Sequence, residues 1–150
     1  MRSPEAAPRD HPFWAEVDGD EPLPPATAHL GLRFLEAVPG SGRIRVAFSP
    51  KPQFVNPRGQ IQGGFLAAML DDTLGAALAT TLARNEFAVS LEIKVSFLRA
   101  APLGRVIGEG RVTRRGRSIA FVEGELRDDA EEVLATATST ARIHAKPGHE

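Results

Sequence analysis

Short stretches in which hydrophobic and polar residues alternate run through most of the chain. Alternation of this kind places every second side chain on the same face of a β-strand. It is clearest between residues 87 and 98, where hydrophobic residues at Phe87, Val89, Leu91, Ile93, Val95 and Phe97 predict one face, and Ser90, Glu92, Lys94 and Ser96 predict the other. Further strands are predicted at residues 103–114, 117–126 and 132–144, and a hairpin at residues 29–38 and 43–49. The short turns between them indicate an antiparallel sheet.

One segment, residues 63–84, has helical character instead. It reads GGFLAAMLDDTLGAALATTLAR, is rich in Ala and Leu, and is apolar around most of its circumference. Paired glycines stand at its start, and Arg84 followed by Asn85 marks its expected end. Because a helix this apolar is buried on nearly all sides, we expect an α+β fold in which a curved antiparallel sheet wraps around one long helix.

Composition limits the partners and the chemistry. The 150 residues suit one folded domain, and a formal net charge of −1 gives no reason to expect a nucleic-acid or membrane partner. The absence of cysteine excludes disulfides, thiolate metal sites and cysteine nucleophiles, and the four histidines lack the spacing of a metal site. No export signal or membrane span is recognisable, so we expect a cytoplasmic protein without a metal.

Proline content separates the ends of the chain from its centre. Half of the twelve prolines lie within the first 25 residues. We therefore expect an irregular N-terminal arm at residues 1–28, with a short helical turn near Phe13 and Trp14, that lies over the domain. The domain itself is expected at residues 29–146, followed by a tail at residues 147–150.

Candidate chemistry lies where the loop after the hairpin enters the predicted helix. At Gly63 and Gly64 a ligand can approach the backbone closely, and the free N–H groups of a helix start, with a partial charge of about half an electron, suit a developing oxyanion. Asp71 and Asp72 follow about two turns later, and could act on the same bound group. A carboxylate among Ala and Leu needs a partner or a function. Periodicity does not choose between the two acids, and both features also fit tight packing and a complemented helix dipole.

The same residues resemble a known family, the PaaI-like hotdog thioesterases. Its members have an Asn, then His-Gly-Gly six residues later, then an acid nine residues after the His. Here Asn56, Gln62-Gly63-Gly64 and Asp71 reproduce that spacing, with Gln62 in place of the His. The segments SLEIKVSFLRAAPLG at 90–104 and RRGRSIAFVEGEL at 114–126 extend the resemblance, which covers residues 30–143. It implies a hotdog fold and an acyl-CoA thioesterase that needs no cofactor, since coenzyme A is part of the substrate.

The resemblance also implies roles for individual residues. Asp71 would activate water or attack the thioester carbonyl directly, and Gly63 would donate its N–H to the carbonyl oxygen with help from Asn56. Ser90 would orient the water, and Gln62 keeps a positioning role because its amide cannot titrate. The substrate-binding residues implied are Gly64 and Arg58 near the helix start, and Arg115, Gly116, Arg117 and Ser118 at a basic strand turn that meets coenzyme A phosphates.

Members of this family build each active site from two subunits, so the resemblance implies a homodimer or a homotetramer. A partner would also cover the apolar helix. A hotdog dehydratase or hydratase is disfavoured, because no His lies near the paired glycines. A non-catalytic hotdog module that binds acyl-CoA as a sensor stays open because Gln62 replaces the His, although the chain shows no helix-turn-helix segment. The sequence does not predict the acyl preference.

Overall fold

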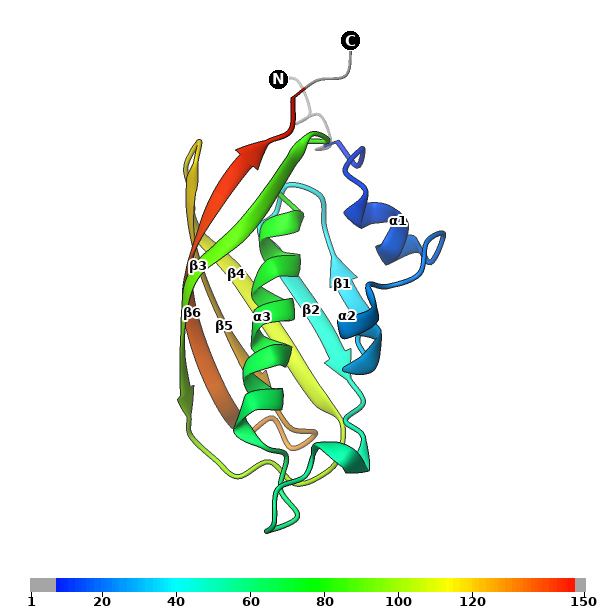
Figure 1. Ribbon diagram of the computed structural model, residues 1–150, viewed down its shortest axis with the longest axis vertical. Coiled ribbons are helices and arrows are strands. Elements are labelled where there is room, and N and C mark those ends of the chain that lie inside the picture. Colours follow the sequence, from blue (N-terminus) through cyan, green and yellow to red (C-terminus); the bar gives the residue numbers. More distant parts are fainter. Residues whose placement is uncertain (1–7, 148–150) are drawn as a thin grey trace.

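A curved six-stranded sheet wraps around one long helix in the computed structural model, which describes residues 8–147 (Figure 1). All neighbouring strands are antiparallel, in the order β1-β2-β4-β5-β6-β3. The elements are β1 (Arg33–Ala37), β2 (Arg43–Phe48), β3 (Glu86–Phe97), β4 (Val106–Arg115), β5 (Ile119–Arg127), β6 (Val133–Ala145) and the helix α3 (Gly63–Ala79). The predicted α+β fold is confirmed.

Helix α3 ends at Ala79, five residues before the predicted end. The hydroxyl of Thr80 donates to the carbonyl of Ala77, and the backbone carbonyl of Thr80 accepts the N–H of Gly40 in the turn between β1 and β2. That carbonyl is therefore not used by a further helical turn, although Leu82 and Ala83 favour helix. Within residues 8–147, no helix is long and apolar enough to cross a membrane.

Two short helices occupy part of the expected arm. Helix α1 (Phe13–Asp18) confirms the helical turn near Phe13, and α2 (Pro25–His29) takes up residues where the first strand was expected to begin. The strand starts only at Arg33 because Gly31 turns the chain with a positive φ of 72°, and a Cβ there would lie 2.8 Å from the carbonyl oxygen of Ser49. Both helices lie on the β1 side of α3 (Figure 1).

The core fills the space between α3 and the inner face of the sheet. Its largest fully buried side chains are Phe48, Phe54, Met69, Leu70, Leu78, Leu126 and Leu134. Helix α3 is nevertheless open along one side, where Gly64, Asp71 and Gly75 are exposed. These positions recur at intervals of seven and four residues, so they share one face of the helix. The expected burial on nearly all sides is therefore not reached within one chain.

A β-bulge in β3 changes which side chains face the helix. Ser90 pairs with Ala141 of β6, but the next pair is Glu92 with Thr140, so Leu91 is the extra residue. Before the bulge Ser90 lies on the inner face with the buried Ala141, whereas after it Ile93 lies on that face. The prediction that the six hydrophobic residues from Phe87 to Phe97 share one face is therefore wrong. The bulge brings Ser90 to the side of α3.

Candidate active site

The loop before α3 is shaped by the side chain of Asn56. Its Oδ1 atom accepts the backbone N–H of Arg58 at 2.9 Å and of Gln60 at 3.1 Å, which closes the turn. Gln62 is the N-cap residue of α3, and its side chain makes no capping hydrogen bond. Within the described part of the chain, the N–H groups of Gly63 and Gly64 have no acceptor. The helix start therefore presents two free donors, as the sequence predicted.

The two glycines at this helix start have different surroundings. A Cβ at Gly63 would lie 3.2 Å from the ring of Phe97, so the absence of a side chain lets the end of β3 pack against the helix start. A Cβ at Gly64 would meet nothing within 4 Å, and this residue is exposed. A ligand can therefore reach the helix start from the side of Gly64.

Further along α3, Asp71 meets Ser90 of β3. The Ser90 hydroxyl donates to Oδ1 of Asp71 at 3.4 Å, and both residues are exposed. Asp72 has a different environment, because one of its carboxylate oxygens is buried without a hydrogen-bond partner among residues 8–147. Burial raises the pKa of Asp72, the Thr27 side chain of α2 lowers it, and Asp71 raises it further. Asp72 therefore faces the N-terminal arm, whereas Asp71 faces Ser90.

Gly63 and Asp71 are too far apart to act on one carbonyl group within a single chain. Eight residues separate them, and a rise of about 1.5 Å per residue places their backbones roughly 12 Å apart along the helix axis. A hydrogen bond to the carbonyl oxygen spans only about 3 Å. The expectation that a single chain brings both groups to the same bound group is therefore not met. The chain contains two half-sites, one at Gly63 and one at Asp71.

The predicted phosphate-binding turn joins β4 to β5, at the opposite end of α3 from Gly63 (Figure 1). Arg115 is already engaged there, because its guanidinium lies 2.6 Å from Glu86 and donates to the carbonyl of Gly116 at 2.7 Å. Arg117 forms no ion pair with a carboxylate in the part of the chain that is described. The carbonyl of Ser118 accepts the N–H of Ile143. Arg58 lies at the other end, in the loop before Gly63.

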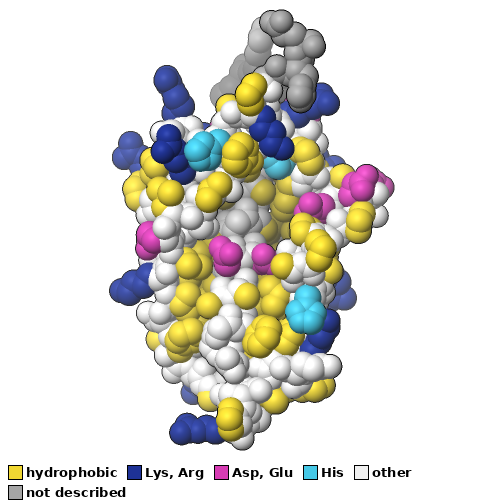
Figure 2. Space-filling view, viewed as in Figure 1, with side chains coloured by type: hydrophobic (Ala, Val, Ile, Leu, Met, Phe, Trp, Pro, Cys, Tyr) yellow, Lys and Arg dark blue, Asp and Glu magenta, His cyan; other side chains and the backbone are white. Residues whose placement is uncertain are grey.

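A hollow of about 230 Å³ lies between α3 and the inner face of the sheet, beside Ser90. It is lined by His11, Leu74, Gly75, Leu78, Ala79, Leu82, Phe87, Ala88, Ser90, Val122, Ser139 and Ala141. In the same orientation as Figure 1, hydrophobic side chains gather beside α3 with acidic side chains at mid-height (Figure 2). The sequence did not single out Gly75 or His11. A glycine inside an Ala- and Leu-rich helix is unfavourable, however, and was the available signal for Gly75.

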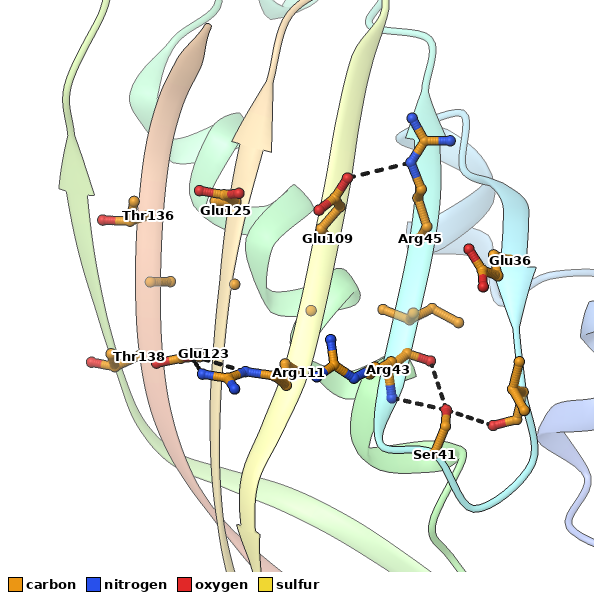
Figure 3. Close-up of a pocket in the computed structure, with 15 residues that line it drawn as sticks. Glu36, Ser41, Arg43, Arg45, Glu109, Arg111, Glu123, Glu125, Thr136 and Thr138 are labelled. Carbon is orange, nitrogen blue, oxygen red and sulfur yellow. Dashed lines mark hydrogen bonds and ion pairs between the residues drawn. The ribbon is translucent and has the colours of Figure 1, made fainter. Parts of the chain in front are cut away.

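A larger depression, of about 710 Å³, lies on the face of the sheet opposite α3 (Figure 3). Rows of charged side chains line it, and several of them pair with one another, as Arg45 does with Glu109 at 3.3 Å and Arg111 does with Glu123. None of the predicted site residues lines this depression. We therefore place the candidate active site on the side of α3, at Asp71 and Ser90.

Comparison with known families is decisive at this point. The profile of the thioesterase superfamily matches residues 59–135, a span that contains Gly63, Asp71 and Ser90. The chain belongs to the thioesterase superfamily. This is a family of thioester hydrolases, and its hotdog fold accounts for the sheet wrapped around α3.

Individual members of the superfamily support the same assignment. A phenylacetic acid degradation-related protein from Ralstonia eutropha JMP134, described as a candidate thioesterase, is 35% identical and has a TM-score of 0.82, covering 87% of this chain and 98% of that one. A candidate esterase from Saccharolobus solfataricus is 34% identical over 88 residues, 58% of this chain and 61% of that protein, so the match spans less than two thirds of this curated relative.

A third neighbour shows likeness in fold alone. The smu.793 protein from Streptococcus mutans UA159, solved bound to acetyl-CoA, is 21% identical with a TM-score of 0.69, and the match covers 78% of this chain and 91% of that one. Together with the match to the Ralstonia protein, the structural neighbours confirm the PaaI-like resemblance. The roles of individual residues stay predictions.

Proposed function

We propose that this chain hydrolyses an acyl-coenzyme A thioester to a free acid and coenzyme A. The observation that carries the proposal is the contact between Asp71 and Ser90, an exposed carboxylate beside a hydroxyl donor within a thioesterase-superfamily fold. The S. mutans neighbour bound to acetyl-CoA supports a coenzyme A thioester as the substrate class. No cofactor is needed, because the carboxylate and the backbone donors supply the required chemistry.

In the proposed mechanism, Asp71 acts on the thioester carbonyl in one of two ways. As a general base it takes a proton from water, whose oxygen attacks the carbonyl carbon. As a nucleophile its own oxygen attacks and forms an anhydride that water then hydrolyses. In both cases the carbonyl oxygen gains negative charge, the carbon–sulfur bond breaks, and the thiolate leaves and is protonated. Ser90 orients the carboxylate or the water through its hydroxyl.

The oxyanion is held by the N–H of Gly63, and the distance along α3 requires that this Gly63 come from a second copy of the chain. Strand β3 is an edge of the sheet and exposes Val89 and Leu91, so it offers a surface for pairing with another β3. A two-fold axis across this strand brings the Gly63 end of one copy toward the Asp71 region of the other. A homodimer, or a homotetramer made of two dimers, therefore completes the site.

The same pairing accounts for the place of the basic turn. It lies at the far end of α3 from Gly63 within one chain, and the two-fold axis carries it toward the Gly63 end of the second copy. Arg117 is then available for a coenzyme A phosphate, as is Arg58 in the loop before α3. Arg115 contributes by holding the turn to Glu86, and Gly116 and Ser118 by shaping it.

The proposal is tested by following thiol release from acyl-coenzyme A by wild type and by Asp71→Asn. We expect turnover to fall by about a hundredfold or more, because the amide neither accepts the proton nor attacks the carbonyl. Asp72→Asn is the matched control, since Asp72 faces the arm, and its turnover should stay within a few-fold of wild type.

The outcome also separates catalysis from sensing. If Asp71→Asn retains the full rate, Asp71 has no part in the mechanism. If wild type binds acyl-coenzyme A without turning it over, the protein is a non-catalytic binding module. The uncapped, non-titrating Gln62 at the helix start is the observation that favours this second function.

A further inference from the structure

The hollow between α3 and the sheet begins at the proposed reaction centre. Ser90, which contacts Asp71, lines it, and Leu74 and Gly75 follow Asp71 by three and four residues and lie on nearly the same face of α3. From there it extends along the helix to Leu78 and Leu82. A group attached to a carbonyl at Asp71 can therefore enter the hollow directly.

The lining of the hollow offers no charged partner to a bound group. Most of its residues are apolar, and the polar ones are already hydrogen-bonded elsewhere. The Ser139 hydroxyl donates to the carbonyl of Glu92 at 2.7 Å, and the Ser90 hydroxyl donates to Asp71. A carboxylate or ammonium group placed here would lose its hydration without compensation, so the hollow selects against charged acyl groups.

His11 of the N-terminal arm limits the hollow at its far end. Its Nε2 atom lies 2.9 Å from the carbonyl oxygen of Glu86, and its Nδ1 atom accepts the N–H of Phe13 at 3.1 Å. The two contacts fit an uncharged ring that carries its proton on Nε2. They fix the ring beside the start of β3, near Leu82, and leave a hollow of limited depth.

The volume sets the size of the occupant. A cavity of about 150 Å³ lined by apolar side chains accepts benzene. By the same ratio, the 230 Å³ available here holds roughly nine carbon atoms at most. We infer that the hollow is an acyl pocket for uncharged, apolar acyl groups of about six to nine carbon atoms, and that Gly75 keeps it open. This inference rests on the proposed thioesterase function.

Gly75 offers a direct test because it lines the hollow and a Cβ there would meet nothing within 4 Å. Gly75→Leu therefore fills the space without displacing the backbone. Gly104→Leu is the matched control, since a Cβ at this exposed loop position also meets nothing within 4 Å. His11→Ala opens the far end and should extend the accepted length.

The experiment compares kcat/KM for acetyl-, hexanoyl-, octanoyl- and dodecanoyl-coenzyme A, together with adipoyl-coenzyme A as the charged counterpart of hexanoyl. We expect wild type to prefer octanoyl over acetyl, and hexanoyl over adipoyl, by about tenfold or more in each case. Gly75→Leu should lose about tenfold or more on octanoyl while acetyl changes by less than about threefold, and Gly104→Leu should match wild type. His11→Ala should gain on dodecanoyl.

Failure of this inference is distinguishable from failure of the proposed function. A flat profile from acetyl to dodecanoyl, equal rates for hexanoyl and adipoyl, or an equal loss on all substrates in Gly75→Leu would overturn the acyl pocket while hydrolysis stands. Absence of hydrolysis on every substrate would overturn the proposed function. In that case calorimetric titration with octanoyl- and acetyl-coenzyme A still tests the pocket, since it predicts tighter binding of octanoyl that Gly75→Leu removes.

Discussion

Two adjacent carboxylates, Asp71 and Asp72, leave the same turn of α3 toward different surroundings. Asp71 is exposed and accepts the Ser90 hydroxyl. Asp72 buries one oxygen against the N-terminal arm, where Glu16 of α1 is a further acid whose pKa is raised, first by its own burial. Charge–charge repulsion between Glu16 and Asp72 adds to this effect. One residue is placed for chemistry and its neighbour for attaching the arm.

Asp72 makes a prediction about stability and pH. Because burial raises its pKa in the folded state, the folded protein binds this proton more tightly than the unfolded chain does. Stability is therefore lost as the pH rises from the unfolded value of 3.8 through the raised folded value. Asp72→Asn lacks this loss, so its melting temperature relative to wild type should rise between pH 4 and pH 7. A difference that stays constant or narrows over that range would contradict the assignment.

Gln62 shows what a single side chain changes at the helix start. The free N–H groups of Gly63 and Gly64 do not depend on it, because they follow from the geometry of a helix N-terminus. A histidine at this position would add a group that titrates near neutral pH, whereas the amide of Gln62 keeps one charge state. The oxyanion site is therefore independent of pH at this position.

At the scale of elements, α3 lies unusually close to β4 and β5. A Cβ at Gly110 of β4 would lie 2.9 Å from the backbone oxygen of Thr73, and one at Gly124 of β5 would lie 2.8 Å from the side chain of Leu74. The absence of side chains at these two positions lets the helix backbone settle onto the sheet. The position of Asp71 relative to Ser90 depends on this spacing.

Gly110→Ala should therefore destabilise the protein. The added methyl group must displace the backbone of α3, and overpacking of this kind costs about 1–3 kcal/mol. Urea denaturation measures the loss, and Gly104→Ala serves as the control because its methyl group meets nothing within 4 Å. Equal stability of the two variants would show that α3 is not held by this contact.

The sequence predicted the elements well because their signals are local. Alternation identified all the strands, and the Ala- and Leu-rich run identified α3. What it missed depends on contacts between distant segments. The helix ends early because Thr80 is taken by the β1–β2 turn, and the faces of β3 change because its pairing with β6 skips Leu91. The difference between Asp71 and Asp72 likewise appears only when the arm and β3 are in place.

At the scale of the whole molecule, the exposed edge of β3 predicts assembly. Val89 and Leu91 are apolar and about half exposed on a strand that ends the sheet. Val89→Lys combined with Leu91→Lys should reduce the mass in solution to the 16.1 kDa of one chain. It should also abolish thiol release, because Asp71 then lacks the Gly63 of a second copy.

Light scattering and the thiol assay on the same sample test this expectation. Val38→Lys is the matched control, since Val38 is an equally exposed apolar residue that lies beyond the end of β1, at the other edge of the sheet. A monomeric double variant with full activity would show that one chain forms the complete site. A wild type that is itself monomeric and active would lead to the same conclusion.

The bulge at Leu91 divides β3 into two segments with opposite parity. Before it, even-numbered residues such as Ser90 face the helix, and after it odd-numbered residues such as Ile93 and Phe97 do. Ser90 meets Asp71, whereas Phe97 packs on Gly63, so each segment serves a different half-site. A one-residue shift within the first segment would turn Ser90 outward and leave Phe97 in place. The acid half and the oxyanion half of the site can thus diverge separately in evolution, although a single strand carries the supports of both.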